Sequence, residues 1–340
     1  MLTNALSKLS NKQDLTRDES YGAMNQIMSG EATEAQIAGF LMGLRLKGET
    51  VEEITGCATV MREKAVRISS KHPNIIDTCG TGGDASGTFN ISTTAAIIAS
   101  ASGAAVAKHG NRAVSSRCGS ADVLKALGVN IEVSPEHSAK TLDETGITFL
   151  FAPLMHGAMK YAANVRRELA IRTIFNILGP LTNPAGAQRQ VIGVFDPTLT
   201  EKLAGVLRQL GSQHALVVHG QGGFDELSTV GWTKVSELRE GTVKSYEIKA
   251  RDLGLQIASV ESLRGGDVSQ NVEILRGVLD AKKGPARDIS LLNSGAALFV
   301  SGKAASITEG IALSREAVDS GAAKRKLNDW IESSRSGQAS

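Results

Sequence analysis

Two short apolar runs, each ending in a glycine-rich polar loop, constrain the fold of this chain more than any other feature. Ile75–Thr78 leads into Gly80-Thr81-Gly82-Gly83-Asp84, and Ala104–Lys108 leads into a loop that reaches Ser120. Buried strands that deliver loops to one sheet edge have this pattern. Glycines leave backbone amides accessible because no side chain blocks a ligand. The pattern predicts an anion site at a sheet edge.

Two further segments strengthen that prediction. The run Ser92–Ala101 reads as a helix, so Asn90, Ser92 and Thr93 would lie at its amino terminus, where free amides and the helix dipole attract phosphate. A third glycine-rich loop, Gln221–Ser228, carries the adjacent carboxylates Asp225 and Glu226, whose hard oxygens suit magnesium. A solvated surface turn is the alternative for that pair. The spacing of 80–84 matches neither the dinucleotide fingerprint nor a Walker loop.

Composition narrows the class of protein. The chain has 340 residues, of which 41% are hydrophobic, and a net charge of +2, too small to favour nucleic acid or an anionic membrane as partner. The amino terminus lacks a secretory pattern, and the apolar segment Ala95–Ala107 is shorter than the roughly 20 residues of a membrane span. We therefore expect a cytoplasmic protein with no membrane partner. Cys57, Cys79 and Cys118 are widely spaced, which favours free packing thiols over nucleophiles.

Helical signals dominate the first fifth of the chain. Residues 1–67 contain only helical patterns, opened by the capping boxes Thr16 with Glu19, Thr33 with Gln36 and Thr50 with Glu53. The pattern breaks at His72-Pro73, where strands begin to alternate with helices. We predict an α/β protein with a small all-helical subdomain (1–67, joined by parts of 165–190), a larger α/β domain (68–333) and a disordered tail (334–340). Its central mixed sheet is flanked by helices.

The remaining pattern predicts individual elements. Strands are expected at 129–133, 148–152, 191–195 and 215–219 and within 234–248, and a loop at 176–188. Ser120 is expected to cap a helix ending at Gly128, and Pro135 to open the next one. Further helices are expected at 153–172 and 197–210 and between 272 and 331.

Taken together, the motifs resemble one known family over nearly the whole chain. GTGGD at 80–84, NIST at 90–93, KHGNRAVSSRCGSAD at 108–122, FNILGPLTNP at 175–184 and GFDELS at 223–228 resemble anthranilate phosphoribosyltransferases. The resemblance implies a nucleoside phosphorylase-like phosphoribosyltransferase fold. Gly157 is a departure, because proline is expected there in many relatives, and it puts the local helix geometry in doubt.

The resemblance implies a reaction. The 5-phosphoribosyl group of phosphoribosyl pyrophosphate would pass to the amine of anthranilate, giving N-(5-phosphoribosyl)anthranilate and pyrophosphate in tryptophan biosynthesis. It also implies Mg²⁺ and a homodimer formed through the helical subdomain. A pyrimidine nucleoside phosphorylase is the alternative enzyme, although such proteins usually carry an additional carboxyl-terminal domain. A non-enzymatic relative that binds nucleic acid is the alternative of another class.

The resemblance also assigns residues to each ligand. Those for phosphoribosyl pyrophosphate are Gly80, Gly83, Asp84, Thr88, Asn90, Ile91, Ser92, Thr93, Lys108, His109, Gly110, Asn111, Arg112, Ala113, Val114, Ser115, Ser116 and Ser120. Those for anthranilate are Gly80, His109, Asn111, His156 and Arg166, and those for magnesium are Ser92, Asp225 and Glu226. No covalent nucleophile is implied; Lys108, Asn111 and Arg166 would position substrates and stabilise charge.

Elementary chemistry makes these roles sensible. Loss of pyrophosphate from an anomeric carbon develops negative charge on the leaving group, which amides, Lys108 and a metal ion would stabilise. Arg166 would meet a carboxylate as a planar fork. A solvated basic face shared with Arg167 and Arg172 on the same predicted helix is the alternative for Arg166. Hydrogen-bonded packing is the alternative for His109 and His156.

Overall fold

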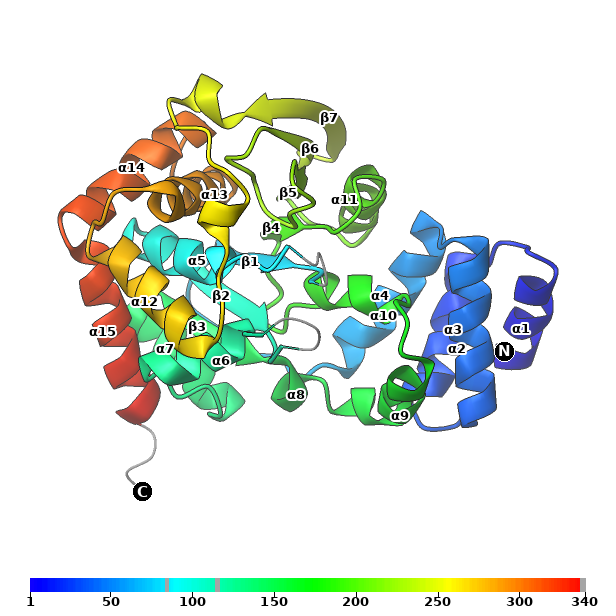
Figure 1. The fold of residues 1–340 in the computed structure, drawn as a ribbon. Coiled ribbons are helices and arrows are strands. Elements are labelled where there is room, and N and C mark those ends of the chain that lie inside the picture. Colours follow the sequence, from blue (N-terminus) through cyan, green and yellow to red (C-terminus); the bar gives the residue numbers. More distant parts are fainter. Residues whose placement is uncertain (83–85, 114–116, 337–340) are drawn as a thin grey trace.

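The computed structural model describes residues 1–82, 86–113 and 117–336 and shows a helical part beside a larger α/β part (Figure 1). The α-helices are α1 (Leu2–Ser10), α2 (Arg17–Met28), α3 (Glu34–Lys47), α4 (Val51–Lys64), α5 (Ile91–Ala101), α6 (Ser120–Leu127), α7 (Pro135–Thr145), α8 (Ala152–Met155), α9 (Lys160–Leu169), α10 (Phe175–Leu178), α11 (Leu199–Gln209), α12 (Val268–Leu279), α13 (Pro285–Ser301), α14 (Ile307–Asp319) and α15 (Ala322–Arg335). Short 3-10 turns are η1 (Gly157–Met159), η2 (Gly179–Leu181), η3 (Ala250–Leu253) and η4 (Glu261–Leu263).

One seven-stranded mixed sheet forms the centre of the α/β part, as predicted. Its strands are β1 (Ile75–Gly80), β2 (Ala105–Gly110), β3 (Ile147–Phe151), β4 (Arg189–Gly193), β5 (His214–Gly220), β6 (Trp232–Arg239) and β7 (Thr242–Lys249), in the order β3-β2-β1-β4-β5-β6-β7. The first five strands in that order are mutually parallel, and β6 and β7 add an antiparallel hairpin. The carboxyl ends of β1, β2, β4 and β5 therefore share one edge.

Alternating side chains of the sheet divide between two apolar cores. Val191 and Leu216 face the core that contains α5, α13 and α15, whereas Ile192 and Val217 face the core shared with α11 and the helical part. Because successive strand residues point to opposite faces, helices cover both faces of the sheet. Figure 1 shows α5 and α13 on one side of the strands and α11 on the other.

The helical part packs as one core. Its three predicted capping boxes are confirmed at the starts of α2, α3 and α4. Side chains from α9 and the segment 174–181, including Ala162, Val165 and Ile177, share that core with Phe40 and Leu41 of α3. The chain thus returns to the helical part after β3, before it enters β4.

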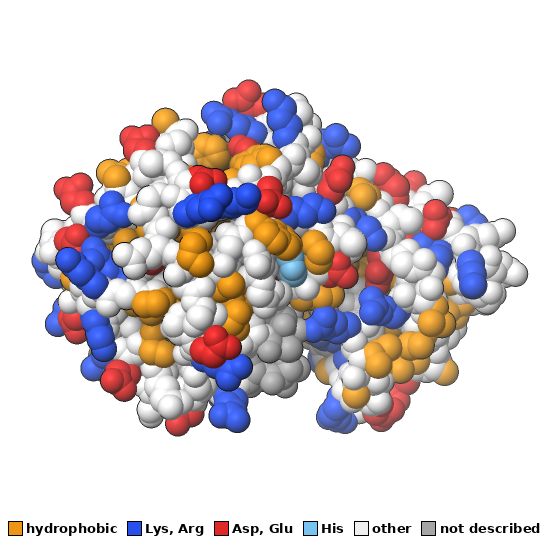
Figure 2. All heavy atoms as spheres, turned by 45° about the horizontal axis from the view of Figure 1, so that its top comes forward, with side chains coloured by type: hydrophobic (Ala, Val, Ile, Leu, Met, Phe, Trp, Pro, Cys, Tyr) orange, Lys and Arg blue, Asp and Glu red, His pale blue; other side chains and the backbone are white. Residues whose placement is uncertain are grey.

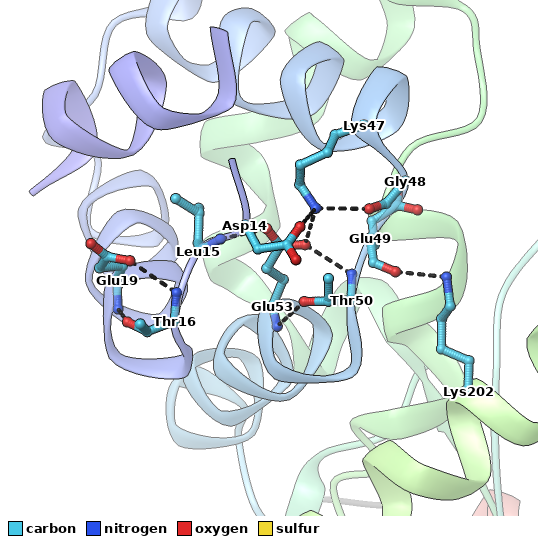
Figure 3. Close-up of polar contacts among 10 residues, drawn as sticks. All are labelled: Asp14, Leu15, Thr16, Glu19, Lys47, Gly48, Glu49, Thr50, Glu53 and Lys202. Atoms are coloured by element: carbon cyan, nitrogen blue, oxygen red, sulfur yellow. Dashed lines mark hydrogen bonds and ion pairs between the residues drawn. The ribbon is translucent and has the colours of Figure 1, made fainter. Parts of the chain in front are cut away.

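A buried polar cluster joins the loops of the helical part (Figure 3). Glu53 is fully buried and accepts hydrogen bonds from the backbone amides of Leu15 at 2.9 Å and Thr50 at 2.8 Å. It also pairs at 2.9 Å with Lys47, whose ammonium reaches Asp14 at 2.7 Å. One carboxylate therefore caps α4, holds the segment before α2 and neutralises a cation at the end of α3.

Several sequence predictions fail locally. The run 129–133 forms no strand: Val129 and Ile131 are buried in the core without sheet partners. Gly119, and not Ser120, is the cap residue of α6, and the end of that helix at Gly128 is confirmed. The 153–172 segment is broken into α8, η1 and α9 rather than forming one helix, and 176–188 contains most of α10 and all of η2.

The carboxyl-terminal helix is longer than predicted. Helix α15 continues to Arg335, although the composition of 334–340 predicted a disordered tail. Ser334 is buried, and its hydroxyl accepts a hydrogen bond from the Asn130 amide at 3.0 Å, so tertiary contacts hold this polar end. Residues 337–340 lie outside the described part. Within the described ranges, none of the helices has both the length and the apolar character needed to cross a membrane.

Candidate active site at the carboxyl edge of the sheet

Two strand-end glycines seat the acidic loop on the sheet edge. A Cβ atom at Gly193 would lie 1.5 Å from the carbonyl oxygen of Asp225, and one at Gly80 would lie 2.2 Å from its Oδ2. Any side chain at either position would displace the loop. The glycines therefore let a segment far along the chain rest directly on β1 and β4, which brings the first and third predicted loops together.

The two carboxylates of this loop reach backbone amides of the predicted anion site. Asp225 Oδ2 accepts from the Gly82 amide at 2.8 Å, and Glu226 Oε1 accepts from the Ser92 amide at 3.0 Å. The second contact lies at the amino terminus of α5, where a negative charge is favoured by the helix dipole. Helix α13 supports the loop through Asn293, whose side chain both accepts from and donates to the Leu227 backbone.

Lys108 brings a buried positive charge to the same place. The residue is 2% exposed, and its ammonium donates to the Thr78 carbonyl and, at 3.1 Å, to Ser92 Oγ. The Thr78 hydroxyl in turn donates to the Ser92 carbonyl at 3.2 Å. Strands β1 and β2 and the start of α5 are therefore tied together around one lysine.

Asp77 lies beneath this cluster and is fully buried. Its Oδ1 accepts from the His109 amide at 3.1 Å, and its Oδ2 accepts from Asn183 Nδ2 at 2.8 Å. Burial raises the pKa of the carboxyl group, while the Lys108 charge and these hydrogen bonds oppose the rise. Asn183 also donates to the Ala107 carbonyl at 2.8 Å, so the 179–184 segment is fastened beside β2.

Two buried histidines line the space next to this segment. The rings of His109 and His156 have centroids 5.0 Å apart, and His109 Nδ1 lies 3.2 Å from the Gly179 carbonyl. Because a carbonyl only accepts, that contact assigns the proton to Nδ1 and leaves Nε2 as an acceptor. Nε2 of each ring is buried and has no partner among the described residues. Both nitrogens therefore lack the hydrogen bond that a buried polar atom normally makes.

Arg166 lies on α9, in the part of the chain between β3 and β4. Its guanidinium lies 5.1 Å from the centroid of the Phe175 ring, and burial lowers its pKa. The neighbouring Arg167 is exposed and donates to Asn164 on its own helix. The two arginines thus differ in surroundings, which argues against one shared solvated face.

The loop after β2 is organised by an acid that the sequence did not single out. Asp122 Oδ2 accepts from the amides of Ala113 at 3.1 Å and Gly119 at 2.9 Å. Asn111 accepts at its carbonyl from the Ser120 hydroxyl at 3.2 Å. Arg112 forms a half-exposed ion pair with Glu132, with Nη2 and Oε1 2.8 Å apart. Gly110 is the last residue of β2.

Other assigned residues lie at the start of α5. Thr88 forms a β-bridge with Arg264, and the Asn90 amide donates to Asn271 Oδ1 at 3.2 Å. Ile91 and Thr93 are buried. The predicted site residues Gly83, Asp84, Val114, Ser115 and Ser116 lie outside the described residues.

Comparison with known proteins places this geometry in a family. The helical bundle domain of the glycosyl transferase family matches residues 3–65, and its a/b domain matches residues 72–324. An anthranilate phosphoribosyltransferase of Moorella thermoacetica is 52% identical over 336 residues, 98% of this chain and 99% of the relative. This chain belongs to the anthranilate phosphoribosyltransferase family.

Solved anthranilate phosphoribosyltransferases share its fold. The Thermus thermophilus structure matches with a TM-score of 0.93 and 43% identity, covering 98% of this chain and 99% of that one. The Saccharomyces cerevisiae enzyme in complex with phosphoribosyl pyrophosphate and Mg matches with a TM-score of 0.89 and 28% identity, covering 98% of both chains. The same yeast enzyme, in complex with 4-fluoroanthranilate, matches with a TM-score of 0.88, 27% identity and the same coverage.

The residues of this family member fit a magnesium ion that is completed by substrate. Asp225, Glu226 and Ser92 converge through the contacts described above and offer hard oxygens. In the described ranges there is no cluster of three or more acidic, histidine or cysteine side chains that forms a metal cage by itself. Magnesium normally binds one or two carboxylates plus substrate phosphates, so this sparse set suits it.

Sequence reasoning missed the residues that hold this family's site in shape. Asp77, Asn183, Asn271 and Asn293 are buried and hydrogen-bonded to site segments. Asn293 lies with Ser290 and Ser294 in the otherwise apolar segment 289–300, and a buried amide in such a segment is a usable signal. The others stand beside polar neighbours, so the sequence alone offers no comparable signal for them.

The cysteines do not act as nucleophiles in this arrangement. Cys57, Cys79 and Cys118 are free thiols. Burial raises the pKa of Cys118 to about 11 and that of Cys79 well above its usual range. Both thiols are therefore protonated at neutral pH, and protonated thiols are poor nucleophiles.

The buried histidines predict acid sensitivity. Burial lowers the pKa of His109 to about 3, with His156 adding repulsion, and burial lowers the pKa of His156 to about 4. The unfolded chain takes up these protons near pH 6.5 and the folded chain only below 4, so stability is full above pH 6.5 and falls as the pH drops. Each histidine contributes a slope of up to about 1.4 kcal/mol per pH unit.

Urea unfolding between pH 8 and pH 4.5 measures this effect. We expect His156→Gln to flatten the decrease of unfolding free energy below pH 6.5 relative to the unmodified protein. At pH 8 both rings are neutral, so the difference in unfolding free energy between the variant and the unmodified protein at that pH serves as the reference. An equal pH dependence in the variant would contradict a neutral, buried His156.

Proposed function

We propose that this chain transfers the 5-phosphoribosyl group of phosphoribosyl pyrophosphate to the amine of anthranilate, as an enzyme of tryptophan biosynthesis. Family membership supports the reaction. The observation that carries it at the level of residues is the seating of Asp225 and Glu226 on Gly82 and the start of α5, beside the buried Lys108. That arrangement joins hard oxygens, free amides and a cation at one sheet edge.

The pyrophosphate end of the donor would lie between these groups. Amides of the 80–82 loop and the amino terminus of α5 would meet phosphate oxygens, and Lys108 would hold Ser92 and the Thr78 carbonyl in place. Magnesium, when bound to Asp225, Glu226 and Ser92, would neutralise charge on the departing pyrophosphate. These fixed groups need no reorganisation during the reaction, which favours the charge-separated transition state. The assigned residues in 83–85 and 114–116 would complete this end.

The acceptor would occupy the space between Arg166 and the two histidines. Arg166 would pair with the anthranilate carboxylate, and Asn111 and Gly80 would border the ring. A neutral His109 whose Nε2 accepts would receive a hydrogen bond from the anthranilate amine. His109 and His156 thereby orient the nucleophile without acting as strong bases, because their conjugate acids have pKa values of about 3 and about 4. Positioning carries this half of the reaction.

A steady-state assay tests the proposal. We expect loss of anthranilate fluorescence when phosphoribosyl pyrophosphate and magnesium are both present, and none when either is omitted. Phosphorolysis of thymidine without anthranilate turnover would favour a pyrimidine nucleoside phosphorylase. Salt-sensitive DNA binding without turnover would favour a nucleic-acid-binding relative. On the face in Figure 2, basic and acidic side chains are interspersed rather than collected into one basic groove.

Substitution of Arg166 tests the acceptor site. We expect Arg166→Ala to raise the KM for anthranilate by about tenfold to a hundredfold, because a hydrogen bond to a charged group contributes roughly 1.5–3 kcal/mol. The KM for phosphoribosyl pyrophosphate should change little. Arg167→Ala, one position away and exposed, is the matched control and should leave both values unchanged. Unaltered anthranilate saturation in Arg166→Ala would exclude the assignment.

We also propose a homodimer formed through the helical part. The side chain of Leu46 on α3 is 76% exposed, and Met1 before α1 is 77% exposed. A second copy packed on this part would cover such apolar side chains. Light scattering of Leu46→Glu, compared with Ile257→Glu in the α/β part, tests the assignment; dissociation is expected only for the first variant.

A further inference from the structure

A second pocket opens at the opposite edge of the sheet from the candidate active site. It has a volume of about 730 Å³ and lies at the amino-terminal ends of β4 and β5 and the carboxyl-terminal end of β6. The side chains that matter for its chemistry are Arg189, Ser212, His214, Arg239, Phe299 and Lys303. Its volume is in the range of pockets that hold small molecules. The proposed transferase reaction uses none of these residues.

Two of its polar atoms have no hydrogen-bond partner in the described part of the chain. They are Arg189 Nε and Ser212 Oγ, both buried at the atomic level, and Ser212 as a residue is only 8% exposed. Arg189 is held in place because its Nη1 donates to the Val300 carbonyl at 2.8 Å. Unpaired buried donors are costly, and native structures contain few of them. Both residues line this cavity, so an acceptor bound there would give each atom the partner that the described part of the chain does not supply.

The charges of the pocket favour an anionic acceptor. Arg189, Arg239 and Lys303 line it, against the carboxylates of Glu240 and Glu309. Glu309 is already engaged, because it accepts from the Ala305 amide at 2.7 Å at the start of α14. Glu240 lies 4.0 Å from Arg239 with both side chains largely exposed, and such a contact neutralises little charge. The three cations outnumber the two carboxylates, so the lining carries a formal charge of +1.

One wall of the pocket is aromatic. The ring of Phe299 meets His214 edge-on with centroids 4.8 Å apart, and the Arg239 guanidinium lies 5.7 Å from its centroid. The Nε2 atom of His214 lies 3.0 Å from Glu237 Oε1, and this contact fixes the orientation of the ring. A ligand with a flat or apolar body could rest on this wall while its charged group meets Arg189 and Ser212.

We propose that this pocket binds a small organic anion, with one carboxylate or phosphate group held by Arg189 Nε and Ser212 Oγ and an apolar body against Phe299. The strand β4 begins at Arg189 in this pocket and ends at Gly193, whose carbonyl accepts from the Thr81 amide at 2.9 Å in the candidate active site. The two sites therefore lie at opposite ends of one strand. Both can be occupied at once.

Calorimetric titration of the full chain with inorganic phosphate and, separately, with benzoate tests the proposal. Substitutions in the pocket leave the candidate active site intact, so a loss of affinity in these variants reports on the pocket alone. We expect the unmodified protein to bind at least one of the two probes and Ser212→Ala and Arg239→Gln to bind that probe about tenfold more weakly. Phosphate binding alone would identify a phosphate-bearing ligand, and benzoate binding alone an aromatic carboxylate. Arg251→Gln, an exposed arginine outside the pocket, is the control and should bind as the unmodified protein does.

Thermal unfolding without the probe separates binding from folding. Burying an unpaired hydroxyl lowers the free energy of unfolding, and Ser212→Ala removes that hydroxyl. The variant should therefore unfold at the same temperature as the unmodified protein or higher. A folded Ser212→Ala variant with unchanged affinity for the probe would overturn the proposal. So would the absence of binding of both probes to the unmodified protein.

Discussion

Replacement of Asp225 by asparagine is expected to lower kcat/KM for phosphoribosyl pyrophosphate by about a hundredfold to a thousandfold, the range seen when one fixed stabiliser of transition-state charge is removed. The amide keeps the shape of the side chain and can still accept from the Gly82 amide, which now lies 2.8 Å from Oδ2. The negative charge that would hold magnesium is lost. Higher magnesium concentrations should therefore restore part of the activity, and the apparent magnesium affinity should fall.

A magnesium titration of initial rates measures this effect. Asp252→Asn, an exposed residue on the η3 turn after the outermost strand β7, is the matched control for the same chemical change and should titrate like the unmodified protein. If Asp225→Asn reduced activity by the same factor at every magnesium concentration, Asp225 would support the loop without binding the metal.

Removal of the Glu53 carboxylate is expected to lower the free energy of unfolding by about 3–5 kcal/mol, the usual cost of leaving a buried ion-pair partner uncompensated. Glu53→Ala would orphan the amides of Leu15 and Thr50, which now donate to it at 2.9 and 2.8 Å. It would also leave the buried Lys47 ammonium with only Asp14 and the Gly48 carbonyl. Figure 3 shows the Leu15 and Thr50 amides and the Lys47 ammonium meeting at the Glu53 carboxylate, with Asp14 and Gly48 on the far side of Lys47.

The other capping box in the same view supplies the control. Glu19 closes the Thr16 box at an exposed site, and its Oε2 accepts from the Thr16 amide at 2.9 Å. Glu19→Ala should cost about 1 kcal/mol, since it removes a solvent-exposed cap and a surface ion pair with Lys8 at 2.6 Å. Urea unfolding of both variants gives the comparison. Equal losses would show that Glu53 acts as an ordinary helix cap and that its burial adds nothing.

Local signals in the sequence were sufficient for many elements. The capping boxes at Thr16, Thr33 and Thr50 are confirmed because each depends only on residues three apart. The strand predicted at 129–133 is wrong. Val129 and Ile131 are buried in the core of the α/β part without pairing in the sheet, and apolar alternation cannot tell which partner buries a side chain. The end of α15 was missed because Ser334 depends on Asn130, a contact between distant segments.

The candidate site likewise depends partly on local patterns and partly on contacts between distant segments. The glycines at 80 and 82, the start of α5 and the acidic pair at 225–226 are visible as local patterns, and they predicted an anion site and a magnesium site separately. That Asp225 rests on Gly80 and Gly193 is set by the order β1-β4-β5, which parallel pairing decides through long-range hydrogen bonds. The supporting residues Asp77 and Asn183 become recognisable only when their partners are known.

The sequence by itself determined the kinds of chemistry that this protein carries: glycine loops open to an anion, paired carboxylates for a hard cation and helices with their own caps. These properties depend on neighbouring residues and on the intrinsic geometry of the backbone. Only the tertiary structure decided which groups meet, because burial and strand order depend on the whole chain. It seated Asp225 on β4, enclosed His109 beside His156, and placed Arg189 and Ser212 in the lining of a pocket at the other end of the same sheet.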